Sequence, residues 1–304
     1  MPSFTHSVSV PDLLARKQAG QSRSAITVLT CYDATTAQLL DASTSSDGQF
    51  AIDALLVGDS LAMTVLGYPD TLSVTVDEML HHVKAVSRGA SRALIIADMP
   101  FMSYQVNADE AVRNAGRMIQ EGRAACVKLE GASALILTVI ERLVSIGIPV
   151  MGHLGLTPQS IRATGGFKVQ SKRASQALQL LKDAKALEAA GAFAIVLEMI
   201  PQPVAHYVSS QLSIPTIGIG AGNGCDGQVL VIDDVLGRYP NLSPRFVRRY
   251  AEQGKEIQTA AAQWATDVRQ RRYPSQDESF WLSDDQWPVQ WPPQDQLLPE
   301  SSAS

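Results

Sequence analysis

Six ionisable side chains stand at or just beyond the ends of short apolar segments of the sequence. The segments read ALLVGD, ALIIAD, ACVKLE, IPVMGH and FAIVLE. The side chains that they deliver are Asp59, Asp98, Lys128, Glu130, His153 and Glu198. Several buried strands that each end in a reactive residue are typical of a parallel barrel with one active-site face. The pattern therefore predicts that these residues gather at one end of such a fold.

Two of the carboxylates, Asp59 and Asp98, occupy matching positions after consecutive apolar segments. In a barrel they would lie within reach of one cation. Carboxylates without a His or Cys cluster suit a hard ion that keeps water and substrate oxygens, which describes Mg²⁺ better than Zn²⁺. Glu130 could join them directly or through a bound water. The alternative is that each Asp only caps the helix that follows, a position where Asp is favoured.

Lys128 and Glu130 alternate along one segment, so their side chains point the same way from a strand. A lysine that faces a barrel interior is costly without an anion nearby. It could pair with Glu130 alone, or it could hold the carboxylate of a substrate. A Schiff-base role is also chemically open, although a lysine crowded by carboxylates would stay charged and be a poor nucleophile.

His153 ends its apolar segment, whereas the other histidines fall in expected helices or near the N-terminus. A single histidine is often structural, but this position favours a functional role. Glu198 ends the next apolar segment and would face the carboxylates from across the ring. A carboxylate there, partly shielded from water, could act as a general base.

The elements that must position these residues alternate between strands and helices. We expect strands at 25–30, 54–57, 93–97, 125–129, 149–152, 193–197, 216–219 and 228–232. We expect helices at 11–19, 77–86, 108–121, 132–145, 174–190, 202–210 and 243–271. The alternation predicts an α/β fold, a (β/α)8 TIM barrel, with a doubly wound open sheet as the competitor. Polar residues at the ends of several strands that are not neighbours favour a closed barrel over an open sheet.

Residues at the helix ends support these boundaries. Asn107 and Ser243, the latter followed by Pro244, are expected N-caps. Gly89 and Gly191 are expected to end their helices. The connections 61–75 and 154–173 are long, and barrel loops of this length often serve as lids over the active site.

Composition places the chain among well-cored globular proteins: of its 304 residues, 45% are hydrophobic and 18% are charged. A net charge of −5 without a basic stripe argues against nucleic acid as a partner. Apolar segments stay well short of the roughly 18 residues that span a bilayer, and the N-terminus lacks the features of a signal peptide. Cys31, Cys126 and Cys225 are too scattered for a disulfide framework. We therefore expect a cytoplasmic protein.

The C-terminal part from Tyr273 changes in composition. It holds Trp281, Trp287, Trp291, five prolines and six acidic residues, with no basic residue. A segment this rich in proline and acid does not build its own core. We expect residues 1–272 to form a single barrel domain and residues 273–304 to form a loosely docked tail, with partner binding as the alternative.

Longer blocks of the sequence resemble the ketopantoate hydroxymethyltransferase family, from about Ala25 to Phe280. The blocks are TCYD, VGDSLAMTVLGYPDTLSVT, ADMPFMSY, VKLEG, GHLGLTPQS, GGFKVQ and IPTIGIGAGNGCDGQVLV, all in order, and LE followed by Pro201. Two parts depart from the family pattern. The loop Asp41 to Gln49 is longer and more polar than expected, and the tail beyond Phe280 lies outside the pattern.

The resemblance implies a barrel of the phosphoenolpyruvate/pyruvate-binding type with one Mg²⁺ per subunit. It implies that Asp59 and Asp98 hold the ion and contact the substrate, with Glu130 in the metal's shell. It implies that Ser60 and Lys128 contact an α-keto acid, that His153 lies beside this acid and that Glu198 is the proton acceptor. The resemblance also implies 5,10-methylenetetrahydrofolate as co-substrate and ring-built homo-oligomers, usually decamers.

The expected reaction transfers a hydroxymethyl group to 3-methyl-2-oxobutanoate and yields ketopantoate for pantothenate and coenzyme A synthesis. Glu198 would remove the C3 proton, and the resulting carbon nucleophile would attack the methylene group of the folate. One alternative is a Mg²⁺-dependent lyase of the same barrel class, acting on a 2-oxo or 2-hydroxy acid without folate. The other is a non-catalytic barrel that binds partners through its tail.

Overall fold

Eight parallel strands close into a barrel in which each strand pairs with the next along the chain and β1 pairs with β8. The structure is a computed structural model that describes residues 7–18, 25–239 and 244–293. The strands are β1 (Ile26–Thr30), β2 (Ala54–Val57), β3 (Leu94–Asp98), β4 (Cys126–Glu130), β5 (Val150–Gly155), β6 (Ala194–Glu198), β7 (Thr216–Ile219) and β8 (Gly227–Leu230). The expected TIM barrel is confirmed, and the open sheet is excluded by the pairing of β1 with β8.

The strands β3 to β6 each run at least one residue further than the sequence indicated. As a result Asp98, Glu130 and Glu198 are the last residues of their strands, and His153 lies inside β5. Their backbones are fixed by the ladder of the sheet instead of belonging to loops. A side chain on a strand is held more rigidly than one on a loop, which suits a site that needs fixed geometry.

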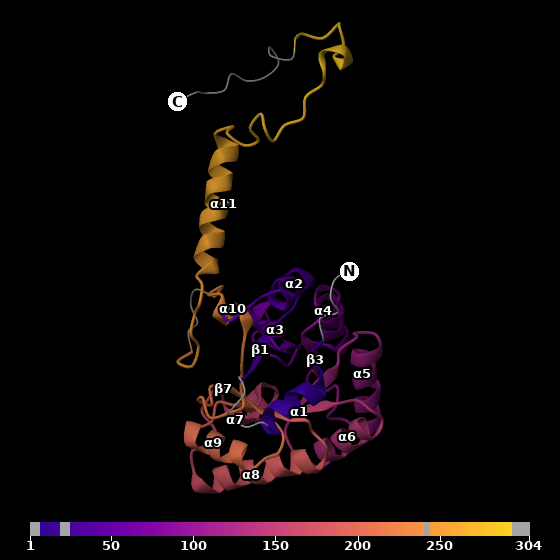
Figure 1. Cartoon of the computed structure of the whole chain (residues 1–304), viewed down its shortest axis with the longest axis vertical. Helices are drawn as coiled ribbons and strands as arrows, with labels where there is room; N and C mark the ends of the chain where they lie inside the picture. The colour runs from indigo at the N-terminus through magenta and orange to yellow at the C-terminus, as the bar shows by residue number, and fades with distance from the viewer. Residues whose placement is uncertain (1–6, 19–24, 240–243, 294–304) are drawn as a thin grey trace. The chain divides into compact units, whose positions relative to one another are not determined.

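Helices cover the outside of the barrel, as Figure 1 shows for α5, α6 and α8. The helices between strands are α2 (Ala34–Asp41), α3 (Leu61–Thr64), α4 (Val76–Gly89), α5 (Ala108–Gln120), α6 (Ala134–Ser145), α7 (Ile161–Thr164), α8 (Ala174–Ala189) and α9 (Gln202–Ser210). Two expected helix ends are confirmed. Asn107 caps α5 by accepting a hydrogen bond from the Glu110 N–H at 2.9 Å, and Gly191 follows α8 with a φ of 97°.

Gly89 has a different role from the expected C-cap. It is the last residue of α4, and Ala90 follows as the cap. A Cβ atom at position 89 would lie 2.2 Å from the carbonyl oxygen of Ala34 and 2.8 Å from Cβ of Ala37. The glycine is therefore required because α4 and α2 approach each other closely, and not because of a left-handed backbone.

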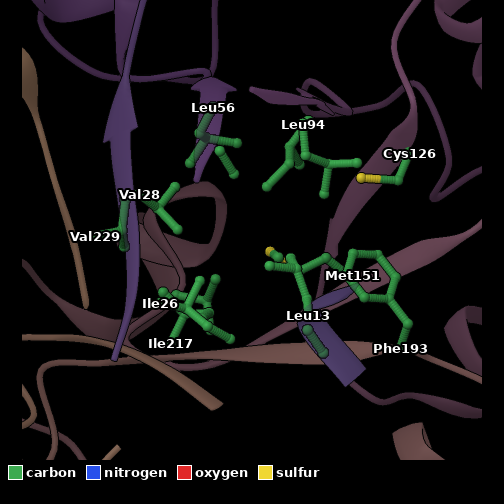
Figure 2. Close-up of a cluster of buried hydrophobic side chains, with 14 residues drawn as sticks. Leu13, Ile26, Val28, Leu56, Leu94, Cys126, Met151, Phe193, Ile217 and Val229 are labelled. Atoms are coloured by element: carbon green, nitrogen blue, oxygen red, sulfur yellow. The ribbon is translucent and has the colours of Figure 1, made fainter. Parts of the chain in front are cut away.

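Alternate residues of each strand fill the inside of the barrel. Figure 2 shows this cluster, in which β1 supplies Ile26 and Val28, β5 supplies Met151, and Phe193 comes from just before β6. The alternation carries on along the strands: after Leu94 and Ile96 the next inward position is Asp98, and after Met151 it is His153. The rule that fills the core with apolar side chains thus also directs the polar ones into the mouth at the carboxyl ends.

The opposite mouth of the barrel is closed by α1 (Val10–Gln18). Its Leu13 is 1% exposed and belongs to the interior cluster of Figure 2. Two ion pairs hold the helix to the barrel: Arg16 Nη1 lies 2.6 Å from an oxygen of Asp53, and Lys17 Nζ lies 2.9 Å from Asp226. Helix α1 therefore covers the amino ends of the strands, opposite the carboxyl ends at which the predicted site residues lie.

The two long connections on the open side contain short helical turns. Residues 61–75 include α3, and residues 156–173 include α7 and the 3-10 turn η2 (Pro158–Ser160). An ion pair joins the two connections, with Arg162 Nη2 3.2 Å from Asp70 Oδ2. The role of these segments as lids stays a prediction.

The chain forms two compact units. Residues 1–235 and 243–248 form the first unit, which contains the barrel and α10 (Ile232–Val235), and residues 236–242 and 249–304 form the second. The second unit contains α11 (Gln253–Arg269) and the turn η3 (Asp284–Gln286). These units do not test the expected domain boundary at residue 272, which stays a prediction. Among the described residues no helix is both long and apolar enough to cross a membrane.

The expected helix over 243–271 begins too early. Ser243 lies outside the described residues, and the segment from Pro244 to Ala251 is not helical. Helix α11 starts only at Gln253, whose N–H donates to the Leu236 carbonyl at 2.9 Å. This bond and the next, from Gly254 to Gly237, bind the start of the helix to a preceding segment that the sequence alone did not connect with it.

Candidate active site

Strands β2 to β6 bring the predicted residues together at the carboxyl ends of the barrel. Register pairs Asp98 with Lys128 across β3 and β4, and Glu130 with His153 across β4 and β5. Glu198 follows on β6, where it pairs with Gly155. The side chains of Asp59, Asp98, Lys128, Glu130 and His153 are all buried, and Glu198 is partly exposed.

Asp59 and Asp98 lie side by side. The backbone N–H of Asp59 donates to Asp98 Oδ2 at 3.2 Å. Burial raises the pKa of Asp59 well above its usual value, and the charges of Asp98 and Glu130 raise it further. Burial also raises the pKa of Asp98, although Lys128 opposes this. Neither Asp caps a helix, because the N-cap positions of α3 and α5 belong to Ser60 and Asn107.

Lys128 forms an ion pair with Asp98 instead of with Glu130 alone: its Nζ lies 2.7 Å from Asp98 Oδ1. Burial lowers the pKa of Lys128, but the charges of Asp98, Glu130 and Asp59 together raise it above the ordinary value. The ammonium group therefore stays protonated at neutral pH. A protonated amine cannot attack a carbonyl, so the geometry disfavours a Schiff base and leaves Lys128 as a fixed positive charge.

His153 stands between two carboxylates. Its Nδ1 lies 3.3 Å from Glu130 Oε1, and its Nε2 lies 3.1 Å from Glu198 Oε2. Burial and the nearby Lys128 lower the pKa of His153, but Glu130 and Glu198 outweigh them and raise it to about 9. A pKa of about 9 favours the charged imidazole at neutral pH, even though Lys128 Nζ lies 3.4 Å from Nδ1. The ring links Glu198 on β6 to Glu130 on β4.

Ser60 follows Asp59 at the start of α3, and its Oγ lies 2.9 Å from the hydroxyl of Tyr32. Ser60 makes no side-chain capping bond to its own helix, and a hydroxyl that bonds Tyr32 keeps capacity for a further hydrogen bond to a ligand. Tyr32 is buried just beyond β1. Tyr32 was not predicted as a site residue, because the sequence marked it only as part of the TCYD block of the family resemblance.

Two further residues of the site were missed. Gln159, in the turn η2, donates from Nε2 to Asp59 Oδ2 at 3.0 Å. Tyr104, between β3 and α5, donates its hydroxyl proton to Gln159 Oε1 at 2.7 Å and accepts from the N–H of Glu130 at 3.1 Å. Both are buried. They lie in loops, so the rule that searches the ends of apolar segments cannot find them.

The donor set fits a hard divalent cation. Three carboxylates, Asp59, Asp98 and Glu130, lie buried in one cluster, where Asp98 Oδ1 meets Lys128 Nζ at 2.7 Å and Glu130 Oε1 meets His153 Nδ1 at 3.3 Å. Buried carboxylates that repel one another, as the raised pKa of Asp59 indicates, are stabilised by a cation. Among the described residues no three His, Cys, Asp or Glu side chains are arranged as a complete metal site. Mg²⁺ takes one or two carboxylates and completes its shell with water and substrate oxygens, and Asp59 and Asp98 are the adjacent pair that could supply them.

Most of the chain matches known proteins in sequence. Residues 7–276 match the family model of ketopantoate hydroxymethyltransferase. A 3-methyl-2-oxobutanoate hydroxymethyltransferase of Syntrophus aciditrophicus is 52% identical over 255 residues, which cover 84% of this chain and 91% of that protein. The enzyme of the same name from Enterococcus faecalis is 49% identical, covering 88% of this chain and 95% of that protein.

Solved structures resemble the fold at low sequence identity. A phosphoenolpyruvate phosphomutase from Streptomyces platensis subsp. rosaceus has a TM-score of 0.56 and 15% identity, covering 86% of this chain and 88% of that chain. A phosphonopyruvate hydrolase solved with oxalate and Mg²⁺ has a TM-score of 0.54 and 13% identity, covering 88% and 92%. At this identity the likeness concerns the barrel alone.

Proposed function

Because this chain belongs to the ketopantoate hydroxymethyltransferase family, we propose that it transfers a hydroxymethyl group from 5,10-methylenetetrahydrofolate to 3-methyl-2-oxobutanoate. The products are ketopantoate and tetrahydrofolate, so the enzyme would serve pantothenate synthesis, in the cytoplasm. The relatives carry the name 3-methyl-2-oxobutanoate hydroxymethyltransferase. The folate donor rests on the resemblance described above.

The observation that carries the proposal is the separation of charge within the site. A fixed cation, Lys128, lies against Asp98 on one side, and a less buried carboxylate, Glu198, lies beside His153 on the other. An α-keto acid has the complementary arrangement, with an anionic end and an acidic C–H next to its keto group. Lys128 and the Ser60 hydroxyl would bind the anionic end, which leaves C3 toward Glu198.

Glu198 would take the C3 proton. Its side chain is 15% exposed, compared with 2% for Asp98 and 4% for Glu130, so it is the carboxylate of this group that substrate can reach. His153 would hold Glu198 in position through Nε2, and it would remain charged because Glu130 faces its Nδ1. A carboxylate in a set orientation close to a C–H is the geometry that general-base catalysis requires.

Asp59 and Asp98 would hold Mg²⁺, with Glu130 contacting its shell. When bound, the ion supplies Lewis-acid stabilisation of the negative charge that develops as the C3 proton leaves, which is worth several kcal/mol. Lys128 would remain paired with Asp98 and would add a second positive charge to the same region. The buried surroundings make both charges more effective, because they exclude water.

The test is a product assay with the purified protein, 3-methyl-2-oxobutanoate and Mg²⁺, with and without 5,10-methylenetetrahydrofolate. The proposal predicts ketopantoate only when the folate is present. A lyase would cleave a 2-oxo or 2-hydroxy acid without the folate, and a non-catalytic barrel would leave all components unchanged. Either of those results would overturn the proposed reaction.

The proposal includes assembly into a homo-oligomer, a decamer by resemblance. Helix α11 supports self-association, because none of its residues is buried and its Ile257, Trp264 and Val268 are exposed. These positions repeat at helical spacing and form one apolar stripe. Light scattering after size-exclusion chromatography measures the mass in solution; a monomer would contradict the assembly without affecting the proposed chemistry.

A further inference from the structure

Gln159 is a neutral residue at the centre of the charged site. It belongs to η2, in the connection that follows β5, and its side chain is buried. An uncharged amide is an unusual neighbour for a cluster of carboxylates, because it adds no charge that could balance them. Gln159 must therefore act on the carboxylates through its hydrogen bonds, which set the orientation of the groups that they join.

The side-chain amide of Gln159 uses all of its hydrogen-bonding capacity. Nε2 donates to Asp59 Oδ2 at 3.0 Å and to the Met99 carbonyl at 2.9 Å. Oε1 accepts from the Tyr104 hydroxyl at 2.7 Å and from Gln105 Nε2 at 2.9 Å. An amide has two donor hydrogens and two lone pairs, so no further bond is possible.

These contacts also fix which end of the amide faces Asp59. The Met99 carbonyl can only accept a hydrogen bond, so the nitrogen of Gln159 must lie on that side. The same nitrogen then faces Asp59 with its second hydrogen. The carboxylate of Asp59 is consequently held through Oδ2 by a donor whose own orientation is set by three other groups.

The backbone of Gln159 reaches a second carboxylate. Its N–H donates to Glu130 Oε2 at 3.1 Å. Tyr104 closes the arrangement, because it binds both the side chain of Gln159 and the N–H of Glu130. One residue of a loop therefore contacts Asp59 and Glu130, which come from different strands.

We propose that Gln159 is a positioning residue that orients the Asp59 and Glu130 carboxylates for the divalent cation. The inference rests on the proposed metal site and adds to it a residue that contacts neither the cation nor the substrate. A neutral donor suits this role: it holds a carboxylate in place without the positive charge of a lysine, which would compete with the cation. Partners of this kind typically contribute about 10- to 100-fold to metal affinity.

The test is a calorimetric titration of the metal-free protein with Mn²⁺. This ion prefers the same oxygen ligands as Mg²⁺. Gln159→Met keeps the length of the side chain and removes every hydrogen bond of the amide. We expect it to weaken Mn²⁺ binding about 10- to 100-fold. The Mg²⁺ concentration for half-maximal activity should rise by a similar factor.

Gln179→Met is the matched control. Gln179 also donates from Nε2 to an aspartate, Asp183 Oδ1 at 2.7 Å, but it lies exposed on α8. This variant should bind Mn²⁺ as the wild type does. Tyr104→Phe serves as a second variant, because it removes the hydroxyl that binds both Gln159 Oε1 and the Glu130 N–H but leaves the Gln159 side chain in place. It should weaken Mn²⁺ binding by a smaller factor.

The outcomes separate the two proposals. If the wild type binds no Mn²⁺, the metal site itself is wrong. If the wild type binds Mn²⁺ and a folded Gln159→Met protein binds it equally tightly, the metal site stands and the role of Gln159 is overturned. If Gln159→Met does not fold, Tyr104→Phe decides: unchanged Mn²⁺ affinity overturns the role, and weakened affinity at a nearly unchanged unfolding temperature supports it.

Discussion

The Nε2 atom of His153 lies 3.1 Å from Oε2 of Glu198, and the same imidazole faces Glu130 through Nδ1 at 3.3 Å. One ring thus joins the carboxylate that substrate can reach to a carboxylate of the buried cluster. The two contacts keep the ring charged, since they raise the pKa of His153 to about 9 despite burial and the nearby Lys128. A charged ring can orient Glu198 without taking the proton that Glu198 must accept.

The first prediction concerns that orientation. His153→Gln should lower kcat by about 10²-fold, because a small displacement of the base is enough to cause a loss of this size. The KM for the keto acid should change much less than kcat. Steady-state kinetics measures both, and His81→Gln, an exposed change on α4, is the control. A normal kcat with a raised KM would show that His153 contacts substrate only.

The second prediction is that Asp59→Asn and Asp98→Asn change the stability of the metal-free protein in opposite directions. Burial and two neighbouring carboxylates raise the pKa of Asp59, so its ionised form destabilises the metal-free fold. Asp59→Asn should therefore raise the unfolding temperature in EDTA by about 2–4 °C if the relief is worth about 1 kcal/mol. Asp98→Asn should destabilise the protein by about 3–5 kcal/mol, because it leaves Lys128 buried without its partner.

Both of these variants should need at least about tenfold more Mg²⁺ for half-maximal activity. Thermal unfolding in EDTA and activity at increasing Mg²⁺ concentration check the two parts separately. An unchanged Mg²⁺ requirement in either variant would remove that residue from the metal site. A lower unfolding temperature for Asp59→Asn would show that its carboxylate is not repelled by its neighbours.

The third prediction concerns Lys128. Its pKa is raised by three carboxylates that outweigh the effect of burial, so the amine carries a proton at neutral pH. Treatment with borohydride in the presence of 3-methyl-2-oxobutanoate should therefore leave no reduced adduct on this residue. Peptide mass spectrometry reads the result directly. A keto-acid adduct at Lys128 would establish a Schiff base and contradict the role of a fixed charge.

The fourth prediction is a pH dependence of stability far from the site. Burial raises the pKa of Asp41, but hydrogen bonds from the N–H groups of Ser91, Ala93 and Arg92 outweigh it, so the pKa is lowered overall. A carboxyl group whose pKa is depressed by folding stabilises the fold above its unfolded pKa, near 3.9. That contribution is lost as the pH falls through the lower, folded value.

Asp41→Asn should therefore cost about 1–3 kcal/mol of unfolding free energy at pH 7. The difference from the wild type should shrink as the pH falls below about 4. Urea unfolding across this range is the measurement, with the exposed change Glu256→Gln as the control. A difference that stays constant down to pH 3 would mean that the charge of Asp41 is not what stabilises the segment from Ser91 to Ala93.

The sequence predicted the barrel because its strands obey two local rules. Each strand is an apolar segment, and the side chains of alternate residues point to the same side. Because the side chain of Ile96 points into the barrel, that of Asp98, two residues later, does so too. On β5 the same alternation places Met151 and His153 on the inward side. These rules can predict residues at strand ends, because the position of a residue along a strand determines the direction of its side chain. The resemblance to a family strengthened these assignments but was not needed to bring the residues to one face.

What the sequence did not show depends on contacts between distant segments. Gln159 lies in the turn η2, and nothing local marks it as the partner of Asp59, one hundred positions earlier. The start of α11 was misplaced because Ser243 and Pro244 form a good local start signal, whereas the actual start at Gln253 is set by a hydrogen bond to Leu236. In both cases a tertiary contact overrides or adds to the local preference.

The central claim, that Glu198 removes the C3 proton of an α-keto acid, is tested most directly by deuterium exchange at C3 of 3-methyl-2-oxobutanoate. The exchange is followed by NMR in deuterated water with Mg²⁺, for the wild type, for Glu198→Gln and for the exposed control Glu141→Gln. The account predicts that Glu198→Gln still binds Mn²⁺ and the keto acid but exchanges about 10²- to 10⁴-fold more slowly. Exchange at the wild-type rate in Glu198→Gln would contradict it.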